Sequence, residues 1–356
     1  MTTSALTPAD VCVVTVTYGD RFGLLEQVLH AVLAADVGHV VVVDNNSEDS
    51  SQQALAQFAN AHSQIHVLTM PRNLGSAGGY AAGINAANQL PCEFIWLLDD
   101  DNVPADNALE LLLNAYLNVS HEHHPVAVAA LRDDRPNLKA WAQGVRTAIT
   151  RPSSVLGFHL LDIPAKLVGR FQQKTPCNLC RLPFAPYGGL LLPRNVIDTI
   201  GLPNTPFYLY SDDYEYTYRI TRAGGHIYLL PDALIYDVDT SWLVDNSSSG
   251  TRKIRPFQRL FLTESDTRIY YTTRNALYWT RHVRTGPYAW FIINLLLVKL
   301  GLIVEAVLSG NWQRWRLLQC AMRDGLSRQL GEVEVTSLPP RHNNMPHADD
   351  ADKVAD

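Results

Sequence analysis

Cysteine is scarce in this chain, and the few cysteines present form no regular pattern. Five occur in 356 residues, an odd number, and Cys177 and Cys180 are the one closely spaced pair. Such a set argues against a disulfide framework and is typical of a reducing compartment. The C-x-x-C pair could belong to a zinc site with donors such as His121, His123 or His124, but no second C-x-x-C completes the usual ligand set.

Positive charge and a leading apolar segment are also lacking. The formal net charge is −6, whereas a nucleic-acid-binding domain normally has a basic balance, so we expect no nucleic-acid partner. Residues 1–10 are polar and lack the apolar core of a secretory signal, so we expect a cytoplasmic protein. The hydrophobic fraction of 47% is sufficient for a sizeable core.

Apolar, β-branched runs alternate with segments of helical periodicity in the first part of the chain. The expected strands are 11–16, 40–43, 65–69, 94–98 and 126–131. Helices are expected between them, one capped by Ser47 and another opened by the glycines of 75–79. This alternation predicts an α/β fold with a doubly wound, mostly parallel sheet that binds its ligand at the carboxyl ends of the strands.

Three consecutive carboxylates follow the fourth expected strand. The apolar run 94–98 leads directly into Asp99, Asp100 and Asp101. Adjacent carboxylates repel each other and are costly to bury unless a cation neutralises them. Mg²⁺ or Mn²⁺, held by carboxylates and phosphate oxygens, is the natural occupant, and a hydrated acidic turn is the alternative.

A second acidic segment lies in the later half of the chain. The stretch 133–186 has weak periodicity and is expected to be a long connection that carries specificity. Regularity returns with a strand at 188–192, and Asp212 and Asp213 then stand at an expected strand-to-helix junction. One of them could deprotonate an acceptor hydroxyl. The alternatives are a helix cap for Asp212, in a capping box with Glu215, and a favourable first-turn charge for Asp213.

The remaining chain contains a polar stretch, one long apolar run and a polar tail. Residues 245–250 followed by Arg252, Lys253 and Arg255 form either a solvated loop or a lid whose cations meet a phosphate. The run 288–308 is interrupted by three polar residues and followed by an aromatic and basic segment, which favours a helix in or against the cytoplasmic leaflet over a buried helix or a true span. Residues 332–356 are expected to be disordered.

Six motifs in a fixed order resemble those of a known family. They are 15–18 (TVTY), 43–47 (VDNNS), 72–79 (RNLGSAGG), 98–101 (LDDD), 210–215 (YSDDYE) and 270–275 (YYTTRN). Together they resemble a family 2 glycosyltransferase with the GT-A fold, in the bacterial rhamnosyl- and galactofuranosyltransferase branch. The resemblance covers about residues 10–285. A dinucleotide fingerprint would instead place the glycines of 75–79 after the first strand.

The resemblance implies roles for the acidic motifs and for the residues around them. Asp99 and Asp101 match the D-x-D positions that bind ribose and metal, and Asp213 matches the general base, with Asp212 as the alternative. The residues implied to bind the nucleotide are Thr17, Tyr18, Asp44, Arg72, Asn73, Asp99 and Asp100. Asp237 stands where this branch usually has a histidine that completes the metal shell, so it is a third candidate metal ligand. Arg274 and Asn275 fit the branch pattern without an assigned role, and packing beneath the site is expected for them.

The implied activity is inverting, metal-dependent sugar transfer. The donor would be a UDP- or dTDP-sugar, with galactofuranose and rhamnose as the leading sugars, and the acceptor a lipid-linked or cell-surface glycan precursor at the cytoplasmic membrane surface. The oligomeric state stays open. A sugar nucleotidyltransferase would carry a glycine-rich basic loop where Tyr18-Gly19-Asp20-Arg21 stands, and a non-catalytic scaffold would not need Asp99, Asp101 and Asp213.

The expected domain organisation follows from these assignments. Residues 1–10 form a polar N-terminus, and 11–240 a catalytic domain with a nucleotide-binding half (11–131) and an acceptor half (132–240). A loop and helix closing the site (241–285), an apolar helical region (286–330) and an acidic tail (331–356) follow.

Overall fold

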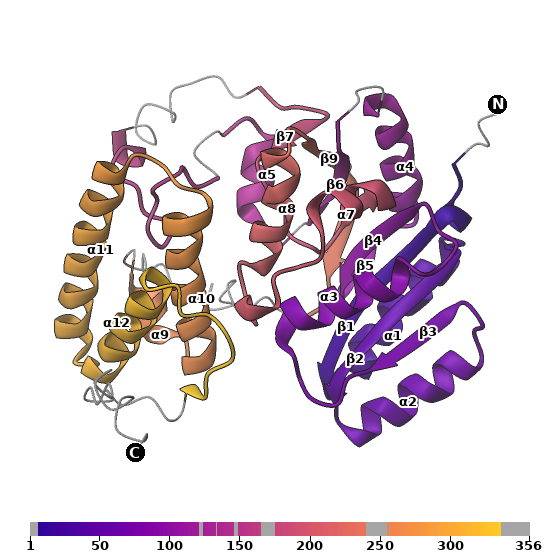
Figure 1. Cartoon of the computed structure of the whole chain (residues 1–356), viewed down its shortest axis with the longest axis horizontal. Helices are drawn as coiled ribbons and strands as arrows, with labels where there is room; N and C mark the ends of the chain where they lie inside the picture. The colour runs from indigo at the N-terminus through magenta and orange to yellow at the C-terminus, as the bar shows by residue number, and fades with distance from the viewer. Residues whose placement is uncertain are drawn as a thin grey trace, which may run out of the picture.

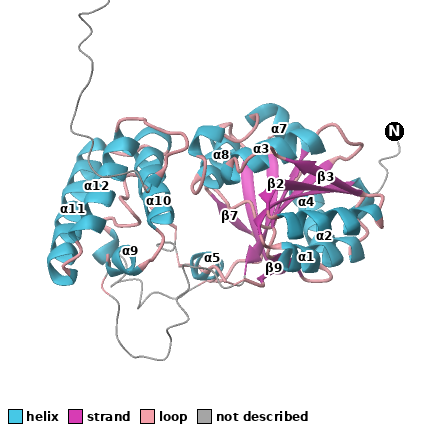
Figure 2. Cartoon of the chain, turned by 90° about the horizontal axis from the view of Figure 1, so that it is seen from below, coloured by secondary structure: helices cyan, strands magenta, loops and turns pink. Residues whose placement is uncertain are grey.

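The computed structural model describes residues 6–120, 124–132, 134–145, 149–164, 175–239, 255 and 257–335. Figure 1 shows two parts side by side, an α/β part that contains the sheet and a smaller group of helices formed by α9 to α12. Seen from below, the sheet lies between layers of helices in the first part, and the second part contains helices alone (Figure 2).

One nine-stranded sheet organises the α/β part, in the order β3-β2-β1-β4-β8-β6-β9-β5, with β7 paired to β9. The strands are β1 (Val11–Gly19), β2 (His39–Ser47), β3 (Ile65–Thr69), β4 (Phe94–Asp99), β5 (Asn102–Pro104), β6 (Val126–Arg132), β7 (Cys180–Leu182), β8 (Leu190–Pro193) and β9 (His226–Asp237). Strands β3, β2, β1 and β4 are parallel, as predicted. Because β8 runs antiparallel between β4 and β6, the complete sheet is mixed.

Helices cover both faces of the sheet, and a second set forms the helical part. In the α/β part they are α1 (Phe22–Ala34), α2 (Asp49–Asn60), α3 (Gly75–Ala87), α4 (Ala108–Val119), α5 (Pro136–Ala142), α7 (Arg194–Ile200) and α8 (Asp212–Arg222). The helical part contains α9 (Gln258–Leu262), α10 (Asp266–Tyr278), α11 (Tyr288–Ser309) and α12 (Trp312–Leu326). Short 3₁₀ turns occur at Pro8–Asp10 and Thr205–Phe207, and α10 continues into a π-helical turn at Trp279–Val283.

The core follows the alternation of side chains along the buried strands. In β1, Val11 and Val13 pack with α1 and α4 on one face, whereas Cys12 and Val14 pack with α3 and α8 on the other. Both faces are covered, which explains why the strands are continuous apolar runs. The sequence prediction of a doubly wound α/β sheet is therefore confirmed.

Several local predictions differ from the structure. Strand β2 extends through the expected turn to Ser47, and Glu48 rather than Ser47 is the N-cap of α2. The apolar segments 227–230 and 233–236 belong to one bulged strand, β9. Cys177 and Cys180 form one local disulfide, which the sequence analysis did not predict, and this bond uses both candidate zinc thiolates.

The helix α11 occupies the apolar run and is partly buried. Its inner face, which includes Val298 and Leu302, packs on the rest of the helical part, while Leu296, Leu300 and Val307 are about 60% exposed. By length and composition it is the one helix of the described residues that could cross a membrane, with 39% of its apolar window buried. The buried-helix interpretation therefore describes the inner face of α11, and the surface-helix interpretation describes its outer face.

Some predictions fall on residues that the structure does not describe. Histidines 121 and 123, the lid candidates 245–254 and the tail from residue 336 lie outside the described ranges. Gly331 to Val335, expected to begin the disordered tail, instead make packed contacts: Gly331 N donates to Pro206 O, and Val335 is buried.

Candidate functional site

The sequence-predicted residues gather at one edge of the sheet, where the parallel strands end. Thr17 near the end of β1 pairs in register with Asp44 of β2. On its other side, Val16 of β1 pairs with Asp99 of β4. The carboxyl ends of parallel strands meet at the same edge, and the structure brings these residues together as the motif order predicted.

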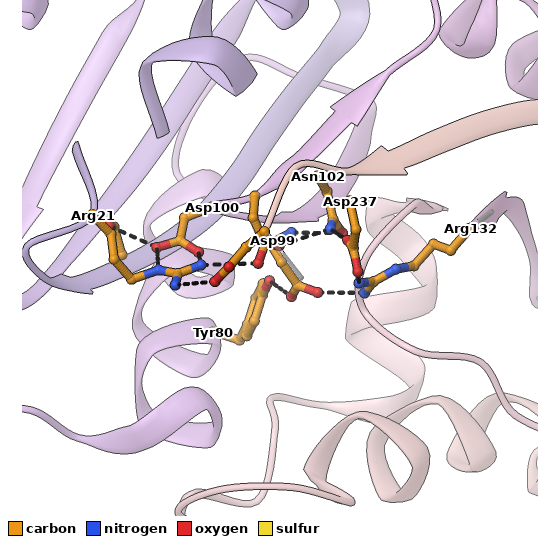
Figure 3. Close-up of polar contacts among 10 residues, drawn as sticks. Arg21, Tyr80, Asp99, Asp100, Asn102, Arg132 and Asp237 are labelled. Atoms are coloured by element: carbon orange, nitrogen blue, oxygen red, sulfur yellow. Dashed lines mark hydrogen bonds and ion pairs between the residues drawn. The ribbon is translucent and has the colours of Figure 1, made fainter. Parts of the chain in front are cut away.

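Two carboxylates at this edge share one buried arginine. Arg132 Nη1 lies 2.6 Å from Asp99 Oδ2, and Arg132 Nη2 lies 2.6 Å from each oxygen of Asp237. Tyr80 donates to Asp99 Oδ1 at 2.8 Å, and Asn102 Nδ2 donates to Asp237 (Figure 3). Burial opposes ionisation of Asp99, yet Arg132 and the Tyr80 hydroxyl outweigh burial and lower its pKa. Asp99 is therefore held as a carboxylate.

A second arginine holds the other two acids of the trio. Arg21 makes a bidentate pair with Asp100, at 2.9 Å for both contacts, and reaches Asp101 at 2.9 Å and Asp239 at 2.8 Å. Thr17 Oγ1 also donates to Asp100, at 2.9 Å. Asp100 is 4% exposed, so the structure places it in the framework beneath the site.

Negative charge exceeds positive charge in this cluster. Asp99, Asp100, Asp101, Asp237 and Asp239 face the two guanidinium groups just described. Burial and the neighbouring charges of Asp99 and Asp100 raise the pKa of Asp101 to about 6. Burial, together with a contact to Asp134, raises the pKa of Asp237 to about 7. The excess favours an additional cation.

Carboxylate oxygens are the ligand type that a hard dication prefers. In this structure, however, the carboxylates are arranged around arginine side chains. Asp99 and Asp237 share Arg132 (Figure 3). Asp101 instead pairs with Arg21. No group of three or more candidate ligands in coordinating geometry is found among the described residues. Gly188 lies against this cluster: a Cβ there would stand 2.1 Å from Asn102 Oδ1, 2.7 Å from Arg132 Nη1 and 3.0 Å from Asp99 Oδ2.

The other expected nucleotide-binding residues line the β1 and β2 side of the edge. Asp44 is buried and its Oδ1 accepts from Ser47 N at 2.8 Å, which fixes the end of β2. Asn73 Oδ1 accepts from Gly75 N at 2.8 Å and so shapes the loop before α3. Tyr18 is 43% exposed. The Arg72 side chain is 63% exposed and its guanidinium pairs with Glu332.

Asp212 and Asp213 begin α8, and the pKa values of both carboxyl groups are strongly raised. Asp212 is the first residue of the helix and Ser211 is the N-cap, so the predicted capping box is wrong; the Asp212 carboxylate instead accepts from Ser76 Oγ at 3.0 Å. Burial raises the pKa of Asp212 to about 7. Burial and the charge of Asp212 raise the pKa of Asp213 to about 8. The charge of Asp99 contributes to both shifts, so the two acidic motifs lie close together.

Sequence reasoning missed the two arginines and the tyrosine that organise the acids. Arg21 and Arg132 stand just after β1 and at the end of β6, so a search for cations near strand ends would have found them. Tyr80 lies in α3, directly after the glycines of 75–79. Of the cations expected in a lid, Arg255 is described, and it pairs with the buried Glu305 at 2.5 Å.

Comparison with known proteins identifies the family. Residues 12–153 match the model described as Glycosyl transferase family 2. Galactofuranosyltransferase GlfT1 of Mycolicibacterium smegmatis (strain ATCC 700084 / mc(2)155) is 30% identical over 226 residues, which are 60% of this chain and 66% of that protein, just under two thirds.

Two solved structures resemble the chain weakly. GalNAc-T7, in a crystal structure with UDP, GalNAc and Mn²⁺, is 15% identical with a TM-score of 0.48, over 66% of this chain and 44% of the other. The mannosyltransferase PcManGT from Pyrobaculum calidifontis, in complex with GDP-Man and Mn²⁺, is 16% identical with a TM-score of 0.48, over 92% and 90%. The family match and the sheet edge described above agree with the expected GT-A fold, and residues 12–153 of this chain form a glycosyl transferase family 2 domain.

Proposed function

We propose that this protein is an inverting glycosyltransferase that moves galactofuranose from UDP-galactofuranose to a hydroxyl of a glycan acceptor. One observation carries the proposal: two features occur in the same site. The pKa of Asp213 is raised to about 8, and the nearby sheet edge has more acidic than basic side chains. A base with a pKa near the working pH and a cation-binding edge are the two requirements of metal-assisted transfer from a nucleotide sugar. The name of the relative favours galactofuranose over rhamnose.

We assign the proton transfer and its support to two residues of this chain. Asp213 would accept the proton of the acceptor hydroxyl as its oxygen attacks C1 of the sugar. The bond from C1 to the diphosphate oxygen breaks in the same step, the nucleoside diphosphate leaves, and the anomeric centre inverts. Asp212, buried and held by Ser76, would keep Asp213 in place and raise its basicity through its own charge.

The nucleotide would lie along the ends of β1, β2 and β4. Asp44 and Asn73 would face the base, and Thr17, Tyr18 and Arg72 would complete the pocket, with Asp100 supporting it from beneath. Asp99 and Asp101 would hold Mn²⁺ or Mg²⁺, with Asp237 as a third donor. When bound, the dication would neutralise charge on the departing diphosphate.

The surface of α11 supports a location at the cytoplasmic face of a membrane, with a lipid-linked acceptor. Its exposed face presents Ile293, Leu296, Leu300, Val304 and Val307 at helical spacing. The acid of the helix, Glu305, is buried and paired with Arg255. An apolar face of this length suits the boundary between headgroups and acyl chains. The acceptor half, 132–240, would then receive an acceptor presented from that surface.

The donor is tested by incubating the protein and Mn²⁺ with UDP-galactofuranose, dTDP-rhamnose, UDP-galactopyranose and GDP-mannose separately. Slow release of nucleoside diphosphate, which needs no acceptor, is expected with UDP-galactofuranose and is expected to be lost in Asp213→Asn. Release from dTDP-rhamnose alone would overturn the sugar assignment. No release from any donor, with no nucleotide binding by calorimetry, would overturn the proposed function.

A further inference from the structure

The backbone that leads into Asp212 is strained at three non-glycine residues. Tyr208 has φ 64°, Tyr210 φ 67° and Ser211 φ 61°. Such left-handed conformations cost about 1 to 3 kcal/mol each and persist where surrounding structure imposes them. The segment 207–211 therefore needs external support to present Asp212 and Asp213 at the sheet edge.

Asn275 of α10 supplies much of that support. Its Nδ2 donates to three carbonyl oxygens of the segment, those of Phe207 at 2.9 Å, Leu209 at 2.7 Å and Tyr210 at 2.8 Å. The residue is fully buried. Because buried amide and carbonyl groups are costly to leave unpaired, this arrangement strongly favours the observed loop conformation.

Arg274 fixes the orientation of that amide. Its Nε donates to Asn275 Oδ1 at 2.9 Å, which turns the NH₂ group of Asn275 toward the loop. Its Nη2 donates to Phe207 O at 2.9 Å and its Nη1 to Gly331 O at 2.6 Å. The guanidinium also lies 4.7 Å from the ring centre of Tyr271. The motif singled out in the sequence thus contacts the loop directly.

The opposite side of the loop rests on the start of α3. Tyr208 O accepts from Ala77 N at 3.2 Å, and a Cβ on Gly75 would stand 2.0 Å from that oxygen. Ser76, between these two residues, donates to Asp212. The loop is therefore held between α3 of the α/β part and α10 of the helical part.

We infer that Arg274 and Asn275 are positioning residues that clamp the strained segment 207–211 and so set the position of Asp212 and Asp213. The clamp acts on the reaction through backbone carbonyls and does not touch substrate. This inference rests on the proposed function for its kinetic consequence. It gives the helical part a role in the reaction that is separate from its outer apolar face.

The test compares Asn275→Ala and the isosteric Asn275→Asp with a matched control, Asn294→Ala. Asn294 is also a fully buried helical asparagine, and it bonds Ser153 O at 3.0 Å and Leu160 N at 2.9 Å. We expect kcat to fall about 100-fold in both Asn275 variants, since a misplacement of about 1 Å costs that much. In the Asn275 variants, the Kd for UDP with Mn²⁺ should stay within about threefold of the wild-type value. In Asn294→Ala, kcat should also stay within about threefold of the wild-type value.

Hydrogen exchange of the amides in 207–214 supplies a readout that does not depend on turnover. Exchange there should accelerate in the Asn275 variants and stay unchanged in Asn294→Ala. If the unchanged protein transfers no sugar, the proposed function fails while this measurement still decides the clamp. Unchanged exchange in a folded Asn275 variant, or an equal kcat loss in Asn294→Ala, would overturn the inference; should Asn275→Ala fail to fold, Asn275→Asp carries both measurements.

Discussion

Asp212 should make the free protein less stable as the pH rises from acid to neutral. Burial raises its pKa to about 7 from the ordinary value of 3.8, although Ser76 donates to it. Each pKa unit corresponds to about 1.4 kcal/mol, so about three units give about 4 kcal/mol. This value is an upper limit, because Asp213 shares the titration.

The direction of this pH effect follows from the protonation of Asp212 in the folded and in the unfolded protein. Below pH 4 the carboxyl is protonated in the folded and the unfolded protein, so it does not affect the free energy of unfolding. Between pH 4 and 7 it ionises in the unfolded chain while the folded protein keeps its proton, so the unfolded state is favoured as pH rises. Asp212→Asn keeps an acceptor for Ser76 and cannot ionise, so we expect equal stability at pH 4 and a gain of about 2 to 4 kcal/mol at pH 8.

Urea unfolding of the free protein, followed by fluorescence between pH 4 and 8.5, measures this difference. Asp106→Asn on the exposed surface is the control, and it should follow the unchanged protein throughout. An Asp212→Asn protein that is no more stable at pH 8, or equally more stable at pH 4, would refute the reasoning. The same variant would show that the site carries a stability cost related to its chemistry.

Three further outcomes are expected. Asp213→Asn should lower kcat by about 10³-fold, within the range of a lost general base, and leave the Kd for UDP nearly unchanged; turnover close to normal would remove the base assignment. Asp101→Ala should weaken Mn²⁺-dependent UDP binding in calorimetry, and an unchanged affinity would contradict a metal role. Leu300→Glu with Val304→Glu should abolish co-sedimentation with anionic vesicles while Leu202→Glu on the α/β part does not, and persistent sedimentation of the double variant would exclude α11 as the contact.

Local pattern was sufficient for the first half of the fold. The strand Ile65–Thr69 has the predicted bounds, and the run that begins at Phe94 ends in the acids as expected. These strands are buried on both faces by neighbouring helices, so burial leaves a continuous signal in the sequence. The antiparallel strand β8 gives the same short apolar signal, and its direction depends on tertiary pairing that a local pattern does not record.

The sequence indicated the acidic residues of the candidate site but not the side chains that pair with them. Asp99 and Asp213 follow recognisable strand and helix boundaries, whereas the pairing of Arg132 with Asp99 joins residues 33 apart. The cap prediction for Asp212 failed because Ser211 adopts a left-handed conformation, in a loop that Asn275 holds from 65 residues away. Such contacts depend on the assembled tertiary structure.

Gly188 shows how a residue without chemistry of its own can be indispensable. Its missing side chain is the space into which Asn102, Arg132 and Asp99 converge. In a saturation mutagenesis screen scored by activity, this position should tolerate substitution as poorly as the carboxylates. An inhibitor survey that looked only for reactive groups would overlook it, because vacant volume is what it contributes.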